Sequence, residues 1–129
     1  MRTSDWLKRE KMQKSSSSFE QGDVVTADIV YSQQFGFKRR PVLVISNTNY
    51  NKTSADLIVI SISSTQPKSK YDLKLGNSDL AEGELRAESK IIVDFPTTIE
   101  KTLIPQKIGK ISAQKLREVK QKIKELYEL

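Results

Sequence analysis

Short runs rich in valine and isoleucine alternate with polar, turn-forming stretches through the middle of the chain. β-Branched residues favour extended backbone, so runs of this kind bounded by Asn, Asp, Ser and Gly are typical of strands. The pattern predicts strands over residues 23–31, 41–46, 57–63, 71–75 and 89–95, with turns at 47–51 and 76–79. Open edges of such strands would invite aggregation, so we expect a bent antiparallel sheet or a small barrel. Pro41 has no amide hydrogen and suits the first position of its strand.

A helical pattern follows at the C-terminal end of the chain. Behind Ser112, a suitable N-cap, apolar residues recur at three- and four-residue steps, namely Leu116, Val119, Ile123 and Leu126. This spacing predicts one amphipathic helix over residues 113–127, with its apolar stripe lying on the sheet. Its basic residues are expected to face mainly solvent; they are Lys115, Arg117, Lys120, Lys122 and Lys124.

The first 21 residues differ in texture from the rest. They mix charged residues with Trp6, Leu7 and Met12, and they run into serines at 15–18. The pattern predicts a short amphipathic helix followed by a flexible link. We therefore expect an N-terminal helical extension, either a loosely packed arm or a contact surface around Trp6, attached to a domain over residues 22–129.

Composition narrows the chemistry that this chain can perform. At 129 residues it has room for one domain with a single modest core. It contains neither Cys nor His, which excludes disulfides, thiolate nucleophiles, Ser-His-Asp triads and most zinc sites. No phosphate-binding glycine loop is present, so we expect no cofactor and no metal, and catalysis would use Arg, Lys, carboxylates and hydroxyls. No signal or membrane-spanning run is seen, so a cytoplasmic protein without a membrane partner is expected.

The formal net charge of +6 is unevenly placed along the chain. Residues 22–99 carry nine basic and nine acidic groups, so the excess of positive charge comes from the two ends. A Lys-rich final helix is more often a solvated face than a nucleic-acid interface. The net charge therefore supports nucleic-acid binding only weakly.

Three side chains are candidates for chemistry on a phosphodiester. Arg40 ends a cationic run just before Pro41, and its planar fork matches two phosphate oxygens. Ser63 ends the next strand, where its hydroxyl either binds a phosphate or closes a turn. Asp94 interrupts an apolar strand, on the opposite face from Val93 and Phe95 by alternation, and is either a base or orienter of Arg40 or a solvated carboxylate.

The order and spacing of several segments resemble the MazF/PemK family of toxins, small ribonucleases of bacterial toxin–antitoxin pairs. The matching segments are Gly22-Asp23-Val24, Arg40-Pro41-Val42-Leu43-Val44-Ile45, Ile62-Ser63-Ser64, residues 89–101 and Ile108-Gly109-Lys110-Ile111-Ser112. The resemblance implies a mainly β, SH3-like antiparallel barrel with a C-terminal helix. It also implies a homodimer that cuts single-stranded RNA in a sequence-dependent way and is silenced by an acidic antitoxin. Arg40, Ser63 and Asp94 would be its catalytic residues.

The same resemblance and the local charge suggest residues that contact RNA around this set. Lys38 and Arg39 would bind flanking phosphates, and Lys68 and Lys70 would form a second phosphate track or keep their loop soluble. Phe35 and Phe37 would stack on bases or pack in a core or dimer contact. Ser64 and Thr97 complete the expected RNA-binding set. The family often has Arg where this chain has Thr97, so Arg39 or Lys101 would have to replace that phosphate contact.

Three functions remain open from the sequence. The first is a metal-independent endoribonuclease that leaves a cyclic phosphate and a free 5′-hydroxyl. The second is an RNA-binding or decayed member of the same fold without turnover, which Thr97 and the charged tail favour. The third is a poison of DNA gyrase similar to the CcdB-type proteins, acting through a terminal helix. Fold alone does not decide between them, because function depends on the site.

Overall fold

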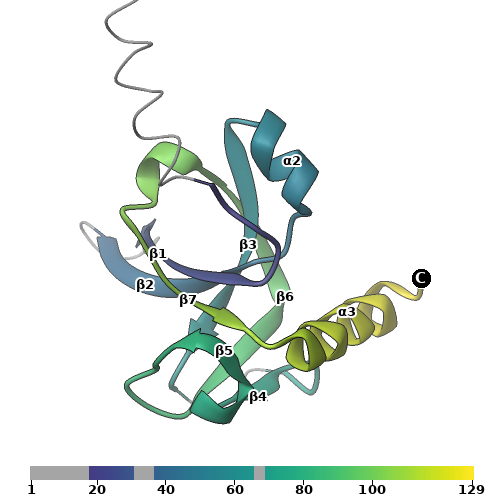
Figure 1. Cartoon of the computed structure of the whole chain (residues 1–129). Helices are drawn as coiled ribbons and strands as arrows, with labels where there is room; N and C mark the ends of the chain where they lie inside the picture. Colours follow the sequence, from purple (N-terminus) through teal and green to yellow (C-terminus); the bar gives the residue numbers. More distant parts are fainter. Residues whose placement is uncertain (1–17, 31–36, 66–68) are drawn as a thin grey trace, which may run out of the picture.

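Seven antiparallel strands form one sheet that curls into a half-barrel (Figure 1). The computed structural model describes residues 18–30, 37–65 and 69–129, and the strands are counted within those ranges. Along the chain they are β1 (Asp23–Val30), β2 (Phe37–Val44), β3 (Asp56–Ser63), β4 (Leu73–Leu75), β5 (Leu80–Gly83), β6 (Ser89–Glu100) and β7 (Gln106–Ile111). Their order across the sheet is β4-β6-β3-β2-β1-β7-β5. The predicted fold class, mainly β with a C-terminal helix, is confirmed.

The chain also forms two α-helices and two 3-10 turns within the described residues. Helix α2 (Thr48–Thr53) lies between β2 and β3, and α3 (Ala113–Tyr127) ends the chain. Single 3-10 turns, η1 (Asn77–Asp79) and η2 (Lys101–Leu103), follow β4 and β6. No helix within the described ranges is long and apolar enough to cross a membrane.

Apolar side chains cover both faces of the curled sheet. On one face Val119 of α3 packs with strand residues in a cluster that we term the α3-side core: Val24, Leu43, Ile60, Ile62, Leu75, Ile91, Val93, Ile111 and Val119. The opposite face carries the far-side core: Phe19, Val25, Ala27, Val42, Val44, Leu57, Val59, Ile99 and Ile104. Buried residues alternate between the two clusters along β2 and β3: Leu43, Ile60 and Ile62 lie in the α3-side core, whereas Val42, Val44, Leu57 and Val59 lie in the far-side core.

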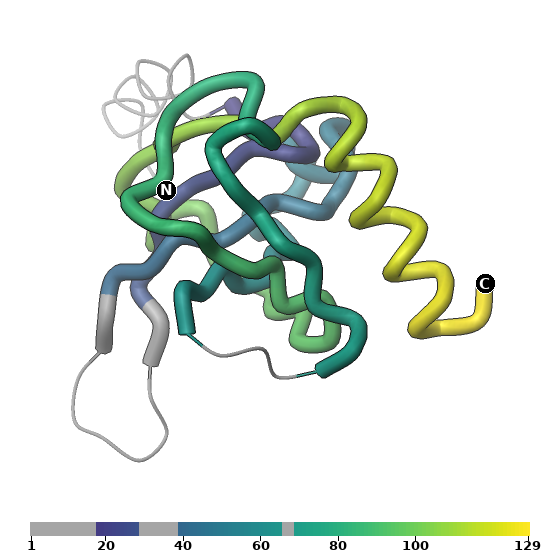
Figure 2. The backbone as a smooth tube through the Cα atoms, turned by 90° about the horizontal axis from the view of Figure 1, so that it is seen from below, coloured from purple at the N-terminus to yellow at the C-terminus, as the bar shows by residue number. Residues whose placement is uncertain are grey.

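The predicted C-terminal helix is confirmed. The hydroxyl of Ser112 accepts a hydrogen bond from the Lys115 amide at 3.0 Å, which caps α3, and the helix ends at Tyr127. Figure 2 shows α3 along one side of the sheet. The prediction for Lys115 was wrong: this side chain is buried, and its ammonium pairs with Glu118 at 2.9 Å and with Asp79 at 3.7 Å. A buried lysine of this kind needs such partners, which periodicity alone does not show.

The sequence pattern predicted that Pro41 begins its strand, and this prediction was wrong. Strand β2 starts at Phe37, and Pro41 lies inside it. The Ile45 amide donates to the Ile58 carbonyl at 2.9 Å, and amides two residues apart in a strand point to the same neighbour. The Pro41 nitrogen therefore faces β3 and has no hydrogen to donate. Pairing between β2 and β3 accordingly ends at Val42 and Ser61.

Other elements were not predicted as the structure has them. The polar stretch expected to be a turn at 47–51 begins helix α2, capped by Asn47, whose side chain accepts from the Tyr50 amide at 2.7 Å. Strand β6 continues to Glu100, and strands β5 and β7 had no clear apolar pattern. These two strands pair closely: a Cβ on Gly109 would lie 2.6 Å from the Glu82 carbonyl oxygen. Glycine permits this approach, and it gives no hydrophobic signal in the sequence.

Candidate functional site

Arg40 and Ser63 lie at the same end of the pairing between β2 and β3. The recorded pairs join Val42 to Ser61 and Leu43 to Ile60, with one register throughout. Continued by two residues, that register sets Arg40 opposite Ser63. Both side chains lie on the face of the far-side core, one step beyond Val42, and both are half-buried. A guanidinium and a hydroxyl therefore stand at the point where β2 and β3 stop pairing.

The hydroxyl of Thr65 lies beside the hydroxyl of Ser63, and the sequence analysis did not identify it. Its Oγ accepts a hydrogen bond from the Thr65 amide at 3.2 Å and shares another with Thr65 Oγ1 at 2.8 Å. Ser63 thus closes the turn after β3, which was one of its two predicted roles. The spacing Ser-x-Thr at a strand end is the signal that identifies this turn. The pair presents two adjacent hydroxyls to the solvent side of the strand end.

Asp94 lies in an irregular part of β6. Strand β3 pairs Ser61 with Ile92 and Val59 with Thr97, so residues 93–96 of β6 stand opposite Ile60 alone. Such bulges re-aim side chains and occur next to active sites. The bulge breaks the alternation that the sequence predicted, because Val93 is buried whereas Phe95 is 64% exposed.

The Asp94 carboxylate is exposed to solvent. The ion pairs within the described residues do not include Asp94. Its role as a base or as an orienter of Arg40 therefore stays a prediction.

Neither residue expected to replace the missing family arginine lies beside Arg40 and Ser63. Arg39 alternates to the opposite face of β2 from Arg40, where its Nε pairs with Asp28 Oδ1 at 3.0 Å. The Lys101 amide donates to the Ala55 carbonyl at 2.9 Å, just before β3 begins, whereas Ser63 ends that strand. Eight residues of strand separate these points by roughly 26 Å. Lys101 therefore does not lie beside Ser63 within one chain, and its replacement of the contact at Thr97 stays a prediction.

The other predicted RNA contacts are scattered around this strand end or lie outside the described residues. Ser64 is exposed directly after β3, and Lys70 is exposed with its ammonium 5.6 Å from the centre of the Tyr71 ring. Thr97 is half-buried opposite Val59, about 13 Å along β3 from Ser63. Phe35 and Lys68 are outside the described residues, as are the side chains of Phe37 and Lys38.

The sequence from residue 20 to residue 127 matches the family model of the PemK-like, MazF-like toxins of type II toxin–antitoxin systems. The chain belongs to this family. No curated protein matches the sequence.

Solved structures of other MazF proteins share the fold of this family member. The MazE–MazF complex from Deinococcus radiodurans (Form-II) has a TM-score of 0.71 at 17% identity, covering 87% of this chain and 97% of that chain. An endoribonuclease in complex with its cognate antitoxin from a mycobacterial species has a TM-score of 0.69 at 17% identity, covering 86% and 96%. The Mycobacterium tuberculosis toxin MazF-mt6 has a TM-score of 0.68 at 19% identity, covering 83% and 97%. At these identities the similarity shows the fold.

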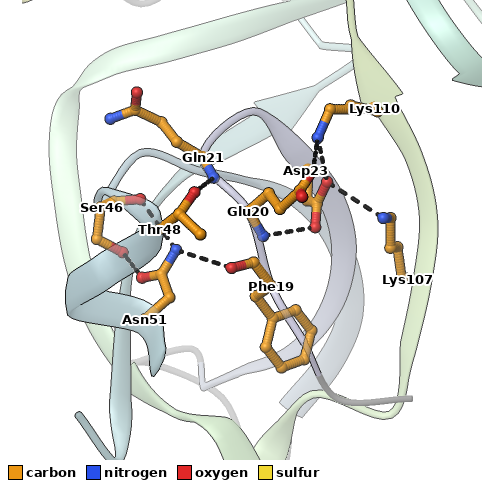
Figure 3. Close-up of polar contacts among 9 residues, drawn as sticks. All are labelled: Phe19, Glu20, Gln21, Asp23, Ser46, Thr48, Asn51, Lys107 and Lys110. Atoms are coloured by element: carbon orange, nitrogen blue, oxygen red, sulfur yellow. Dashed lines mark hydrogen bonds and ion pairs between the residues drawn. The ribbon is translucent and has the colours of Figure 1, made fainter. Parts of the chain in front are cut away.

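The Gly22-Asp23 segment of this MazF-like toxin has a structural role (Figure 3). Asp23 is fully buried, and its Oδ2 accepts from the Glu20 amide at 2.9 Å. Its Oδ1 pairs with Lys110 at 3.2 Å and with Lys107 at 3.3 Å, both on β7. These contacts tie the start of β1 to β7, because a buried carboxylate is stable only with such partners.

Charge coupling around this carboxylate shifts two pKa values. Burial alone would lower the pKa of Lys110, but its hydrogen bonds to Glu20 and Asp23 raise it above its ordinary value. The hydrogen bond from Lys110 lowers the pKa of Glu20, and the charge of Lys110 adds to that effect. Both shifts stabilise the charged forms, the Lys110 ammonium and the Glu20 carboxylate.

A second buried polar group holds the chain before β1 against α2. Asn51 Nδ2 donates to the Ser46 carbonyl at 3.0 Å and to the Phe19 carbonyl at 3.3 Å. The Ser46 hydroxyl hydrogen-bonds to Asn51 Oδ1 and accepts from the Ile58 amide at 3.0 Å. Ile58 is near the start of β3 and Ser63 is at its end, so this group supports the fold and does not join the candidate site.

Proposed function

We propose that this protein is an endoribonuclease toxin that cleaves single-stranded RNA without a metal ion. The observation that supports the proposal is the register of β2 and β3, which, continued by two residues beyond Val42 and Ser61, would set Arg40 opposite Ser63. Membership of the PemK-like, MazF-like toxins and the fold shared with proteins named as endoribonucleases support it.

The chemistry follows from what these groups can do. In RNA the 2′-hydroxyl oxygen attacks the adjacent phosphorus, the bond to the departing 5′-oxygen breaks, and a 2′,3′-cyclic phosphate remains. The Arg40 guanidinium would stabilise the negative charge that develops on the phosphate oxygens and give a proton to the departing 5′-oxygen, which leaves as a 5′-hydroxyl. The proton that the base takes from the 2′-hydroxyl would then return to Arg40 through water. The Ser63 hydroxyl would bind the phosphate or orient the 2′-hydroxyl. Asp94 is the proposed base that takes the 2′-hydroxyl proton.

Cleavage is proposed to depend on RNA sequence through residues around this set. The proposed RNA contacts are Lys38, Arg39, Ser64, Phe35, Phe37, Lys68, Lys70 and Thr97. The exposed Arg39–Asp28 pair has a low energetic cost of separation, about 0–1 kcal/mol, so Arg39 can exchange Asp28 for a phosphate.

The test is incubation of the purified protein with a mixed-sequence oligoribonucleotide in EDTA, followed by mapping of the new termini. We expect cyclic phosphate and 5′-hydroxyl ends at a limited set of sequences. Arg40→Ala should lower the cleavage rate by about 100-fold or more, the usual cost of removing one charge-stabilising donor. Arg117→Ala is the matched control, because Arg117 is exposed on α3. Wild-type cleavage by Arg40→Ala, or dependence of cleavage on added metal, would contradict the proposal.

Two specific observations favour other functions. Thr97 stands where the family often has Arg, which favours a protein that binds RNA without turnover. At the chain end Tyr127 is 54% and Leu129 is 85% exposed, a surface that a gyrase poison of the CcdB type would use. RNA binding without products would indicate the first function. Inhibition of DNA supercoiling beside intact RNA would indicate the second.

Partners and organisation are proposed on the same basis. The complexes of MazF proteins with MazE and with a cognate antitoxin support an acidic antitoxin for this chain, which would cover the Arg40 side of the sheet. A homodimer is proposed because two large apolar side chains are exposed, Phe95 on β6 and Leu103 on η2. We propose a cytoplasmic toxin domain over residues 22–129 preceded by an extension over 1–21. Light scattering of the purified chain and of Phe95→Ser would test the dimer.

A further inference from the structure

A row of polar and cationic residues crosses the sheet from the candidate site to its edge. Strand β6 pairs with β3 and β4, so that Lys90 stands opposite Ser63 on one side and opposite Lys74 on the other. With Arg40 set opposite Ser63 on β2, the row reads Arg40, Ser63, Lys90 and Lys74. Directly paired residues share a face of the sheet, so all four lie on the same face.

Burial of the neighbouring residues fixes which face this is. Leu73 and Leu75 flank Lys74 and pack on the α3-side core. Lys74 therefore points away from α3, to the face that also carries the far-side core. Two residues along β3 from Ser63, on the same face, Ser61 stands opposite Ile92, and Ile92 is buried. The cationic row thus borders the end of the far-side core.

Lys74 and Lys90 place two positive charges directly opposite each other on the paired strands β4 and β6. Like charges directly opposite in a sheet are destabilising. The ion pairs of the described residues include neither lysine.

The acidic residues two positions before each lysine have other surroundings. The Asp72 Oδ2 accepts from the Ser69 amide at 3.2 Å, and the Glu88 carboxylate lies beside Gly76. The row therefore fits a ligand that brings negative charge at regular spacing.

We infer that Lys90 and Lys74 bind the phosphates of RNA on one side of the cleaved bond, continuing the line that begins at Arg40 and Ser63. This inference rests on the proposed function, because it takes Arg40 and Ser63 as the position of the reacting phosphate. Three strand spacings of about 4.8 Å give the row a length of roughly 14 Å, which accommodates a short run of backbone phosphates. Lysine suits this role, since its compact charge binds phosphates without reading the base.

The experiment measures binding apart from cleavage. The probe is a 2′-O-methyl RNA of about 12 nucleotides, which lacks the attacking hydroxyl, and its affinity is measured over a range of salt concentrations. Each phosphate contact contributes about 0.7 to the slope of log K against log salt for single strands. Lys74→Gln with Lys90→Gln should therefore lower the slope by about 1.4. Lys120→Gln with Lys124→Gln is the matched control, since both lysines are exposed on α3.

A second arm locates the contact on the RNA. Neutral methylphosphonates at the two linkages next to the cleaved bond, on one side and then on the other, should weaken wild-type binding. In the Lys74→Gln, Lys90→Gln double variant, the methylphosphonates on one of the two sides should cause no further loss of affinity. This is expected when the two changes remove the same contacts. Additive losses on both sides would overturn the inference.

The remaining outcomes separate this inference from the proposed function. If ordinary RNA stays uncut while the slope change is found, the nuclease proposal fails and the row stands. If ordinary RNA is cut and the slope is unchanged, the row fails and the nuclease stands. An unchanged slope with aggregation of the variant would mean that Lys74 only protects the edge strand β4. An unchanged slope with lost affinity for a polyglutamate peptide would assign the row to an acidic protein partner.

Discussion

Arg40 and Ser63 each lie two residues beyond Val42 and Ser61, the last recorded pair of β2 and β3, at the position where Pro41 ends the pairing of the two strands. Proline has no amide hydrogen, so the ladder stops and the side chains beyond it stand at a strand opening. The same residue that begins the apolar run of β2 thereby shapes the candidate site. The predictions below test this arrangement and the buried charges that support it.

Replacing Arg40 with Lys separates charge from geometry. Lysine keeps the positive charge but loses the planar fork that binds two phosphate oxygens. We expect Arg40→Lys to cleave RNA at least roughly tenfold more slowly than wild type and faster than Arg40→Ala. Single-turnover cleavage at saturating RNA measures this effect. Equal rates for the Lys and Ala variants would show that charge at this position has no catalytic role.

The hydroxyl of Ser63 has both a turn contact and the proposed contact to RNA. Ser63→Ala should lower kcat/KM by about 10- to 100-fold, as expected for the loss of one hydrogen bond to a charged group, about 1.5–3 kcal/mol. Ser63→Thr should retain most of the activity because it keeps the hydroxyl. Thr65→Val removes only the neighbouring hydroxyl and serves as the control. A Ser63→Ala variant that loses thermal stability but no activity would leave Ser63 with the turn alone.

Removal of the buried Asp23 carboxylate should destabilise the fold. Asp23→Ala leaves Lys107, Lys110 and the Glu20 amide without their shared partner, at a cost of about 3 kcal/mol. Urea unfolding followed by circular dichroism measures the difference. Asp28→Ala, which breaks the exposed pair with Arg39, is the control and should change stability by less than about 1 kcal/mol. Equal effects of the two variants would contradict the structural role of Asp23.

The pKa shifts of Lys110 and Glu20 predict how the contribution of this ion pair to stability depends on pH. The raised pKa of Lys110 means that its contribution is complete below the ordinary lysine value and is lost as pH rises through the higher folded value. The lowered pKa of Glu20 means that its contribution is present above the ordinary glutamate value and is lost as pH falls through the lower folded value. The stability difference between wild type and Lys110→Met should therefore be level near neutral pH. It should shrink in acid below about pH 4.5 and in alkali above about pH 10.5.

This pH profile has a direct control. Lys122→Met removes a partly exposed lysine that pairs with Glu125 on α3 at 3.6 Å. Its stability difference should be small throughout. A Lys110 profile that rises in acid would contradict the proposed coupling.

Some elements were predictable because their signals are local. The helix α3 follows from the spacing of four apolar residues and the Ser112 cap, which act within a few turns of chain. Strand β3 follows from one β-branched run. The family resemblance likewise uses the order of short segments, and the match over residues 20–127 confirmed it.

Other features depend on partners distant in sequence. Strands β5 and β7 form because Gly83 and Gly109 let two polar segments approach, and neither segment has an apolar pattern of its own. The bulge at residues 93–96 turns Phe95 outward although Val93 is buried. Lys115 is buried because Asp79 and Glu118 meet it there.

By itself the sequence determined the class of fold, the terminal helix and the chemical types available for catalysis, because composition and periodicity carry that information, and the order of its short segments indicated the family. Only the tertiary structure decided that Arg40 and Ser63 lie at the same end of the β2–β3 pairing, that Lys90 and Lys74 continue the row from Ser63, and that Lys101 lies at the other end of β3. The physical reason is register. A shift of one residue between paired strands would move every one of these side chains to the other face, and no local pattern states which shift the whole sheet adopts.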